Sequence, residues 1–151
     1  MSQPEGSATL RGIWIKRAHR GVLDSATSAT LIAGKGIDGN VDRSRRRQVT
    51  IIDEAAWKRA LAELGAAALN PSARRANFMV CGLDLEQTRG RVLVIGAVRF
   101  SVGGETRPCE RMDEAHDGLQ DALDPEWRGG VFAQVLSEGV VSVGDPVSWE
   151  V

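Results

Sequence analysis

The residues best suited to chemistry in this sequence lie in one short stretch, Arg107-Pro108-Cys109-Glu110-Arg111. A thiol between two guanidinium groups tends to be held as the thiolate, which is the form that attacks electrophiles and binds metals. Cys109 is therefore the candidate nucleophile or metal ligand of the chain. The same five residues also fit an unreactive free thiol beside unrelated arginines, so they do not decide the matter alone.

Two residues of another segment can act together on an anion. The run 75–85 is rich in apolar residues, and we expect it to form a strand. Arg75 and Asn77 stand two residues apart in it, so alternation would place both side chains on one face. The pair is therefore a candidate ligand-binding site.

Two loops offer further anion-binding groups. The segment 31–40 includes Gly34, Gly36 and Gly39, whose backbone N–H groups can cradle an anion, although the segment taken alone is more typical of a plain loop between strands. The basic run 42–47 is typical of a solvated loop, yet one or two of its arginines can hold a phosphate.

The remaining cysteine and the histidines show no metal-binding spacing. Cys81, His19 and His116 do not form a zinc pattern with Cys109, and two cysteines make no disulfide framework. Cys81 lies in an apolar run, where a buried filler is the expected role.

Composition indicates one globular domain spanning residues 1–151. The chain is 42% hydrophobic and 26% charged, as in ordinary soluble proteins. Its formal net charge of −1 gives no attraction to nucleic acid or to an anionic membrane. No apolar run reaches the roughly 20 residues that span a bilayer, and the first residues lack signal-peptide features. We therefore expect a cytoplasmic protein without nucleic-acid or membrane partners.

Alternating apolar residues predict a β-rich fold of seven to nine strands. We expect strands over residues 9–18, 48–53, 75–85, 91–95, 97–102, 128–139 and 140–151, and the last of these segments contains a Gly-Asp turn before an edge-like final strand. Gly96, between two of them, would mark a bend or bulge, and the small residues 21–30 would form a loop. With 17 glycines between short apolar runs, the fold class is mainly β with a few helices, α+β, in a β-barrel.

Helices are expected in two places. Asp53 can cap a helix that runs to Leu64, with Trp57 and Leu61 on its buried face and Gly65 at its end. Residues 110–126 carry seven acidic side chains and one arginine, which predicts one or two short helices with a solvated acidic face.

In order and spacing these pieces resemble the MOSC domain, the C-terminal module of molybdenum-cofactor sulfurases that also occurs as small stand-alone bacterial proteins. The resemblance is strongest over residues 31–151. It rests on Gly36-Ile-Asp-Gly, Arg47-Gln-Val-Thr-Ile-Ile-Asp, Arg75-Ala-Asn-Phe-Met-Val-Cys-Gly-Leu-Asp-Leu, Leu93-Val-Ile-Gly, Arg107-Pro-Cys, Arg128-Gly-Gly-Val and Ser142-Val-Gly-Asp-Pro-Val.

The resemblance implies a barrel-like fold with a cleft for the molybdenum cofactor. Relatives include bacterial reductases of N-hydroxylated bases and the mitochondrial amidoxime-reducing component. In them a cysteine, matched here by Cys109, binds the molybdenum, and a soft thiolate suits such a metal. Their Arg-x-Asn motif contacts the pterin phosphate and matches Arg75 and Asn77. Arg107 lies near the position that frames the cysteine and is expected to face the anion site, whereas Arg111 would pair with the acidic stretch that it opens. Gly36 and Gly39 would add backbone donors.

The sequence also departs from this pattern. Stand-alone relatives often carry aspartate and histidine after the glycine, whereas this chain reads Gly39-Asn40-Val41-Asp42, which can alter or remove the pocket. We expect no pyridoxal phosphate, because an aminotransferase-like domain is lacking. Redox turnover would need a separate electron-donor protein.

Three functions remain open at this point. The first is a small oxidoreductase that reduces N-hydroxylated small molecules with Cys109 on molybdenum. The second is a carrier that delivers the cofactor, or sulfur as a Cys109 persulfide, without redox turnover. The third is a catalytically silent barrel that binds a phosphate ligand or a partner protein.

Overall fold

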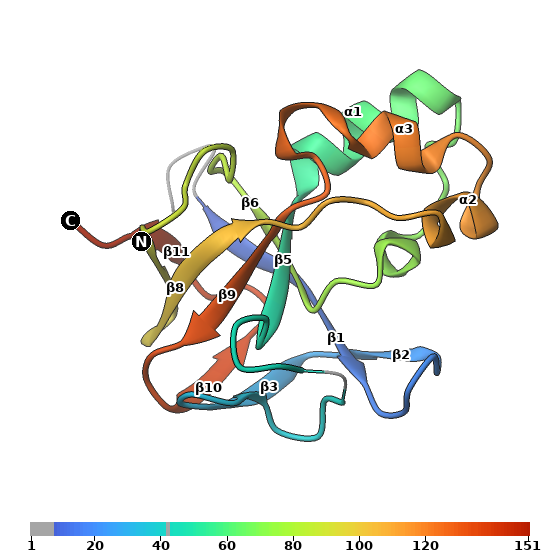
Figure 1. Cartoon of the computed structure of the whole chain (residues 1–151). Coiled ribbons are helices and arrows are strands. Elements are labelled where there is room, and N and C mark those ends of the chain that lie inside the picture. Colours follow the sequence, from blue (N-terminus) through green and yellow to red (C-terminus); the bar gives the residue numbers. More distant parts are fainter. Residues whose placement is uncertain (1–7, 42) are drawn as a thin grey trace.

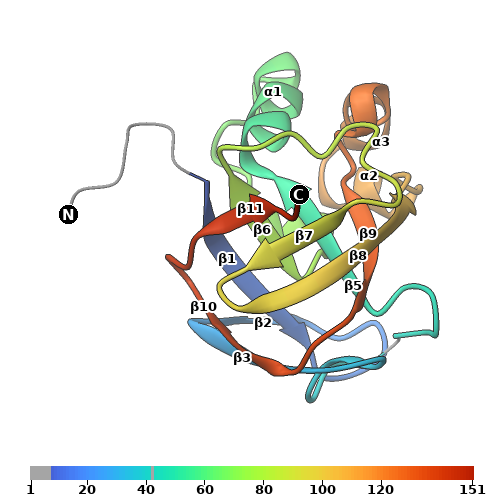
Figure 2. The ribbon, with the colours of Figure 1, turned by 90° about the vertical axis from the view of Figure 1, so that its left-hand side faces the viewer.

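The chain folds around a curled β-sheet with its helices at one end. The structure is a computed structural model that describes residues 8–41 and 43–151. Eight strands form the large sheet in the order β11-β7-β8-β9-β5-β6-β1-β2, and a small sheet has the order β10-β3-β4. Figures 1 and 2 show the large sheet curving around its interior, with the helices away from β3 and β10. The predicted mainly-β class with a few helices is confirmed.

The strands number eleven in the described ranges, more than the sequence predicted. They are β1 Thr9–Lys16, β2 Leu23–Ala26, β3 Ser28–Ile32, β4 Gly36–Ile37, β5 Val49–Asp53, β6 Phe78–Cys81, β7 Val92–Ile95, β8 Val98–Glu105, β9 Val131–Val135, β10 Gly139–Ser142 and β11 Val147–Trp149. The helices are α1 Glu54–Leu64, α2 Arg111–Ala115 and α3 Leu119–Leu123, with 3₁₀ turns η1 Pro71–Arg74 and η2 Pro125–Trp127. No helix in these ranges is long and apolar enough to cross a membrane.

One parallel pair interrupts an otherwise antiparallel sheet. Neighbouring strands run antiparallel except β5 and β6, where Ile51 lies opposite Phe78. Parallel strands need a crossover connection, and α1 together with η1 supplies it here. The crossover returns the chain to the sheet through Arg74, Arg75 and Asn77, so this segment lies at the start of β6.

Two bulges help the large sheet to curl. Register shifts occur between Leu10 and Gly12, where β1 pairs with β6, and between Val102 and Gly104, where β8 pairs with β9. Such bulges bend and twist a strand. At Gly12 a Cβ atom would approach the Trp14 ring to 2.5 Å, so the bulge in β1 needs a residue without a side chain.

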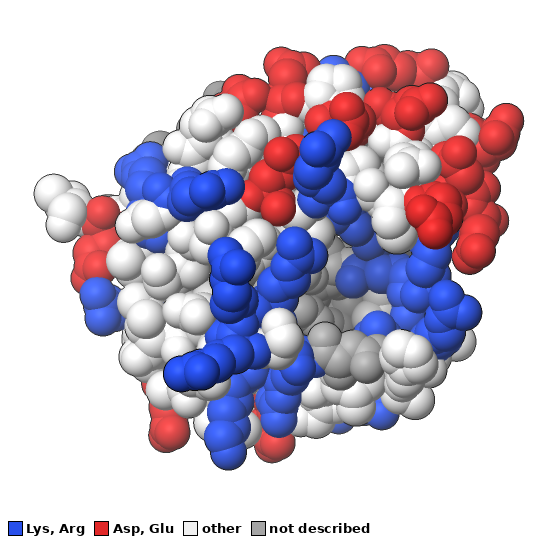
Figure 3. Space-filling view, in the orientation of Figure 1, with Lys and Arg blue, Asp and Glu red and all other residues white. Residues whose placement is uncertain are grey.

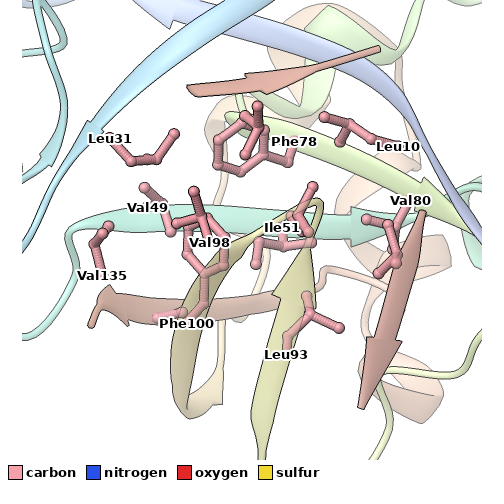
Figure 4. Close-up of a cluster of buried hydrophobic side chains, with 14 of the residues drawn as sticks. Leu10, Leu31, Val49, Ile51, Phe78, Val80, Leu93, Val98, Phe100 and Val135 are labelled. Atoms are coloured by element: carbon pink, nitrogen blue, oxygen red, sulfur yellow. The ribbon is translucent and has the colours of Figure 1, made fainter. Parts of the chain in front are cut away.

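Apolar side chains from both sheets meet in the interior of the curled sheet. Figure 4 shows these side chains converging from strands of both sheets. Phe78 and Phe100 pack edge to face, with ring centroids 5.8 Å apart and planes at 70°. Both are fully buried, as are Leu10, Leu31, Ile51 and Leu93. This interior is the main core. It fixes the positions of the strand ends that carry the polar residues of the candidate site.

The helices pack on a smaller core of their own. Asp53 caps α1 by accepting a hydrogen bond from the Ala55 N–H, and Gly65 ends the helix in the left-handed conformation (φ 63°), as predicted. Trp57 of α1 is buried against apolar side chains of α2 and α3, which include Met112, Leu119 and Leu123. The loop that carries Cys109 therefore enters a helix that is fastened to α1.

Three predictions about local structure were wrong. Residues 21–30 are not a loop, because β2 pairs with β1 and β3 pairs with β10. The strand predicted over 75–85 covers only Phe78–Cys81, since η1 and a left-handed Arg75 precede it. Gly96 lies in the tight turn of the β7–β8 hairpin, with Ile95 opposite Val98, and not at a bend.

The predictions for the acidic stretch and the last strand hold. Residues 110–126 form the short helices α2 and α3, and all seven acidic side chains are exposed. The last strand, β11, lies at one edge of the large sheet, as the sequence indicated.

Candidate functional site

Arg75 and Asn77 line one cavity of about 180 Å³ on the face shown in Figure 3. The lining also includes Asn40 and Thr50, and it is rich in cations. The other lining residues are Lys16, Val41, Arg43, Arg47, Gln48 and Val49. Figure 3 shows a hollow bordered by Lys and Arg, with acidic side chains gathered over the helical end. Arg75 and Asn77 thus line the same cavity, and two arginines of the basic run line it with them.

Strand alternation is not what brings Arg75 and Asn77 together. Arg75 has a left-handed backbone (φ 63°) just after η1, outside the strand. Its Nη2 donates to the Gly21 carbonyl at 2.8 Å, which ties this segment to the start of β2. The two residues therefore do not share a strand face, in contrast to the prediction; a turn before the strand brings both of them to the same cavity.

Asn77 is saturated by hydrogen bonds within the protein. Its Oδ1 accepts from the Thr50 N–H at 3.0 Å, and its Nδ2 donates to the Trp14 carbonyl at 3.2 Å and to Asn40 Oδ1 at 3.1 Å. The side chain is 6% exposed. Asn77 therefore joins β1, β5 and the 36–40 turn beneath the cavity. The sequence suggested a ligand-binding residue and did not predict this structural role.

Asn40, the residue that departs from the family pattern, belongs to the same buried network. Its Oδ1 accepts from the Lys16 N–H at 2.7 Å and from Asn77, while its Nδ2 donates to the Val41 carbonyl at 3.1 Å. An amide satisfies all three contacts, because it has one acceptor atom and one donor atom. With asparagine at position 40, the buried side chains under the cavity thus satisfy one another's hydrogen bonds; we call this network of Asn40 and Asn77 the polar floor.

Two arginines of the basic run face the cavity in fixed positions. Arg43 donates from Nη1 to the Ile37 carbonyl at 2.7 Å. The Arg47 guanidinium lies over the Phe132 ring, 4.7 Å from its centroid, a cation–π contact. The interpretation that one or two of these arginines can meet a phosphate is compatible with this placement. The exposed Arg45 and Arg46 do not line the cavity; they line a neighbouring hollow, to which Arg47 also contributes.

The glycines Gly36 and Gly39 do not line the cavity, and the loop around them is not an open anion cradle. Its backbone N–H groups are used internally: those of residues 34, 35, 38 and 40 donate to the carbonyls of Val135, Ile32, Thr30 and Ile37. Gly36 pairs with Ile32 in the small sheet, and Gly39 lies against the Arg17 guanidinium. Four of the N–H groups that could have met an anion therefore close the turn instead.

Cys109 lies on the loop between β8 and α2, with its side chain exposed. Its carbonyl accepts from the Met112 N–H at 2.9 Å, which starts α2 directly after it. Cys109 is not among the residues that line the cavity of Arg75 and Asn77. A second hollow is lined by Arg75 together with Arg111 and Glu114 of α2, the helix that follows Cys109, and Cys109 is not among its lining residues either.

The two arginines beside Cys109 are paired with carboxylates. Arg107 is exposed and its Nη2 lies 3.2 Å from Asp124 Oδ1. Arg111 lies 4.0 Å from Glu114, as its position before the acidic helix suggested. Arg107 therefore faces the acidic helical end in this structure and not the cavity, which corrects its expected position at the anion site.

Sequence reasoning missed Arg74. Its side chain is 7% exposed and donates to the carbonyls of Gly129 and Thr106 at 3.0 and 3.1 Å. Burial lowers the pKa of the Arg74 guanidinium to about 10, while the Cys109 thiol acts in the opposite direction. The only signal in the sequence was its place beside Arg75 and before an apolar run.

The side chains of the described residues do not form a metal site of their own. In residues 8–41 and 43–151 no group of three His, Cys, Asp or Glu side chains can hold a metal ion. One exposed thiol and a cationic cavity nearby fit a metal complex that carries its own sulfur ligands and an anionic end.

Comparison with known families decides the assignment. The sequence pattern of the MOSC domain matches residues 38–148, most of the chain. The chain belongs to the MOSC domain family. Membership of this family is associated with binding of the molybdenum cofactor.

Solved structures share the fold of this MOSC domain. The YuaD protein from Bacillus subtilis superposes with a TM-score of 0.81 at 20% identity, covering 93% of this chain and 94% of YuaD. YiiM from Geobacillus stearothermophilus gives a TM-score of 0.74 at 15% identity over 95% of this chain and 75% of YiiM. YiiM from Escherichia coli gives 0.68 at 15% identity over 94% and 69%. No curated protein sequence matches this chain.

Proposed function

We propose that this MOSC domain binds the molybdenum cofactor through Cys109 and reduces N-hydroxylated small molecules with electrons from a separate donor protein. One observation carries the proposal. The cationic cavity of Arg75, Arg43 and Arg47 shares Arg75 with a second hollow, and that hollow is also lined by Arg111 at the start of α2, two residues after the exposed Cys109. A ligand with a phosphate at one end and a thiophilic metal at the other suits this arrangement.

Different residues of the chain would hold different parts of such a ligand. The guanidinium forks of Arg43, Arg47 and Arg75 match the geometry of a phosphate, and the cavity of about 180 Å³ admits a group of that size. Asn77 and Asn40 keep the floor of the cavity in shape through their mutual hydrogen bond. Cys109 offers its exposed sulfur as the metal ligand. The bound cofactor supplies the oxygen-atom transfer chemistry that no side chain provides.

Elemental analysis tests the proposal directly. The protein is produced in a host that makes the cofactor, and molybdenum per chain is measured for the native sequence, Cys109→Ala and Cys81→Ala. We expect near-stoichiometric molybdenum in the native protein and in Cys81→Ala, and at least a ten-fold lower content in Cys109→Ala. Cys81 is the matched control because its sulfur is half-buried and contacts Thr9 Oγ1 at 3.2 Å. Equal metal content in all three would refute the role of Cys109.

A second candidate function is favoured by the exposure of Cys109. A sulfur carrier needs a thiolate that can reach the persulfide of a donor protein. The Cys109 thiolate would attack the outer sulfur of that persulfide, form Cys109–S–SH, and release the donor as its thiolate, so that no external oxidant is consumed. Metal-free protein that accepts radioactive sulfur from a persulfide donor, and loses this ability in Cys109→Ala, would support the carrier over the reductase.

A further inference from the structure

Arg74 is enclosed by the loop that carries Cys109. Its Nη2 donates to the Thr106 carbonyl at 3.1 Å, and its Nη1 lies 4.0 Å from the Met112 sulfur. These two residues are three positions before and three positions after Cys109. On the far side, Nε donates to the Gly129 carbonyl at 3.0 Å. One buried guanidinium thus fastens both arms of the loop to the strand entry at Gly129.

Space for this arrangement exists because residue 129 is a glycine. A Cβ atom there would approach the Thr106 carbonyl oxygen to 2.5 Å, Pro108 Cδ to 3.1 Å and Arg74 Nη2 to 3.3 Å. Thr106, Pro108 and the guanidinium therefore pack directly on the Gly129 backbone. The loop has little freedom to move away from Arg74.

The charge of Arg74 has no carboxylate partner in the described part of the chain: its contacts are two carbonyl oxygens and a thioether. Buried charges are normally paired. With a pKa of about 10 the guanidinium is still protonated at neutral pH, so its charge acts on whatever lies close by. By contrast, Arg107 and Arg111 are offset by Asp124 and Glu114.

We propose that Arg74 is the positioning residue of Cys109, which anchors the 106–112 loop and supplies this loop with a buried positive charge that has no carboxylate partner among the described residues. This inference rests on the proposed function only in taking Cys109 as the reactive sulfur. It assigns to a buried arginine the role that the sequence gave to the two arginines next to the cysteine. The ligand that this charge favours is anionic, whether a metal complex or a persulfide.

The test compares two alkylating reagents of similar size on metal-free protein. Iodoacetate is an anion and iodoacetamide is neutral, and both attack the same thiolate. Their rate ratio at Cys109, read by peptide mass spectrometry, therefore reports the local potential and not the thiolate fraction. We expect Arg74→Met to lower the ratio on the order of five-fold, the scale of one nearby charge in a solvated surrounding. Arg74→Lys should restore most of it.

Matched variants separate charge from loose packing. Arg107→Met and Arg111→Met remove paired charges and should change the ratio by less than about two-fold. Cys81 serves as an internal control whose ratio should stay constant. If Arg74→Met only loosens the loop, both reagents speed up together and the ratio is unchanged, which would overturn the proposal.

A measurement on the Arg107→Met/Arg111→Met double variant covers the case in which Arg74→Met does not fold. Arg74 is intact in this protein, so a ratio near the native value supports the proposal, and a collapse of the ratio refutes it. Because no step uses molybdenum, failure of metal binding to Cys109 leaves this result standing. The two proposals therefore fail independently.

Discussion

Asn77→Asp provides the sharpest test of the polar floor under the cavity. The substitution keeps the size of the side chain and replaces its Nδ2 donor with an oxygen. That oxygen would face two acceptors, the Trp14 carbonyl at 3.2 Å and Asn40 Oδ1 at 3.1 Å, in a side chain that is 6% exposed. If Asn77 mainly contacted a ligand, the substitution would hardly change the free energy of unfolding of the ligand-free protein.

The expected loss of stability follows from the two hydrogen bonds that the Asn77 Nδ2 group donates and that aspartate cannot donate. Each lost buried hydrogen bond costs about 1–3 kcal/mol, because the new carboxylate oxygen faces the Trp14 carbonyl and Asn40 Oδ1 without a proton to share. Two contacts offset part of the cost: Asn40 Oδ1 keeps the Lys16 N–H, and the bond from the Thr50 N–H to the carboxylate is strengthened. We therefore expect a loss of about 2–5 kcal/mol in the free energy of unfolding at about pH 8. This is a large share of the roughly 5–15 kcal/mol typical of a domain.

The same variant has a defined pH dependence. Burial among acceptors raises the pKa of the new carboxyl in the folded state above its value in the unfolded chain. A group with a raised pKa in the folded state contributes most stability below its unfolded pKa, and this contribution is lost as pH rises through the folded pKa. The deficit against the native protein should therefore shrink as the pH falls from about 8 to about 4, where the protonated acid can donate again.

Urea unfolding followed by tryptophan fluorescence gives the assay, with equal slopes as the check for two-state comparison. Asn70→Asp is the matched control. Asn70 is exposed and caps η1 through Oδ1, which accepts from the Ser72 N–H at 2.9 Å, and aspartate caps equally well. If Asn77→Asp lowers the free energy of unfolding by less than about 0.5 kcal/mol, as a typical surface substitution does, the hydrogen-bond network does not explain why asparagine stands at position 77.

Two further predictions concern the scaffold of the site. Phe78→Ala should lower the free energy of unfolding by about 3–5 kcal/mol, since its buried ring packs on Phe100, and urea titration against an exposed Val140→Ala control checks this. Burial raises the pKa of Asp53 above its usual 3.8, against the hydrogen bonds from the backbone N–H groups of residues 55 and 56. Asp53→Ala should cost about 1 kcal/mol through the lost cap, whereas Asp53→Asn keeps the cap and should gain on the native protein as pH rises from about 3 to about 6. A constant difference in stability between the Asp53→Asn variant and the native protein over that range, measured by thermal unfolding, would contradict the raised pKa.

The sequence was sufficient where neighbouring residues determine the outcome. Asp53 and Gly65 delimit α1 because a cap needs an oxygen at one end and a left-handed residue at the other. The apolar alternation of β5, β8 and β9 marked the core strands, and the flanking proline and arginines marked Cys109 as the residue to examine. These signals act over a few residues, so they can be read without the fold.

Contacts between distant segments determined the rest, and they carry the site. Strands β2 and β3 form because β1 and β10 offer them partners, although residues 21–30 look like a loop. The glycine turn donates its N–H groups to carbonyls of other strands, and Asn77 uses its amide on Trp14, Thr50 and Asn40. Buried polar groups must find partners, and which partners are near is set by the tertiary fold.

Cys109 shows the division between sequence and tertiary structure most clearly. The sequence identified the cysteine and placed two arginines beside it, because residue type and spacing are visible in one dimension. Folding turned those arginines toward Asp124 and Glu114 and buried a third, Arg74, under the loop from a distant part of the chain. Electrostatic influence depends on distance and burial in three dimensions, and only the tertiary structure supplies these.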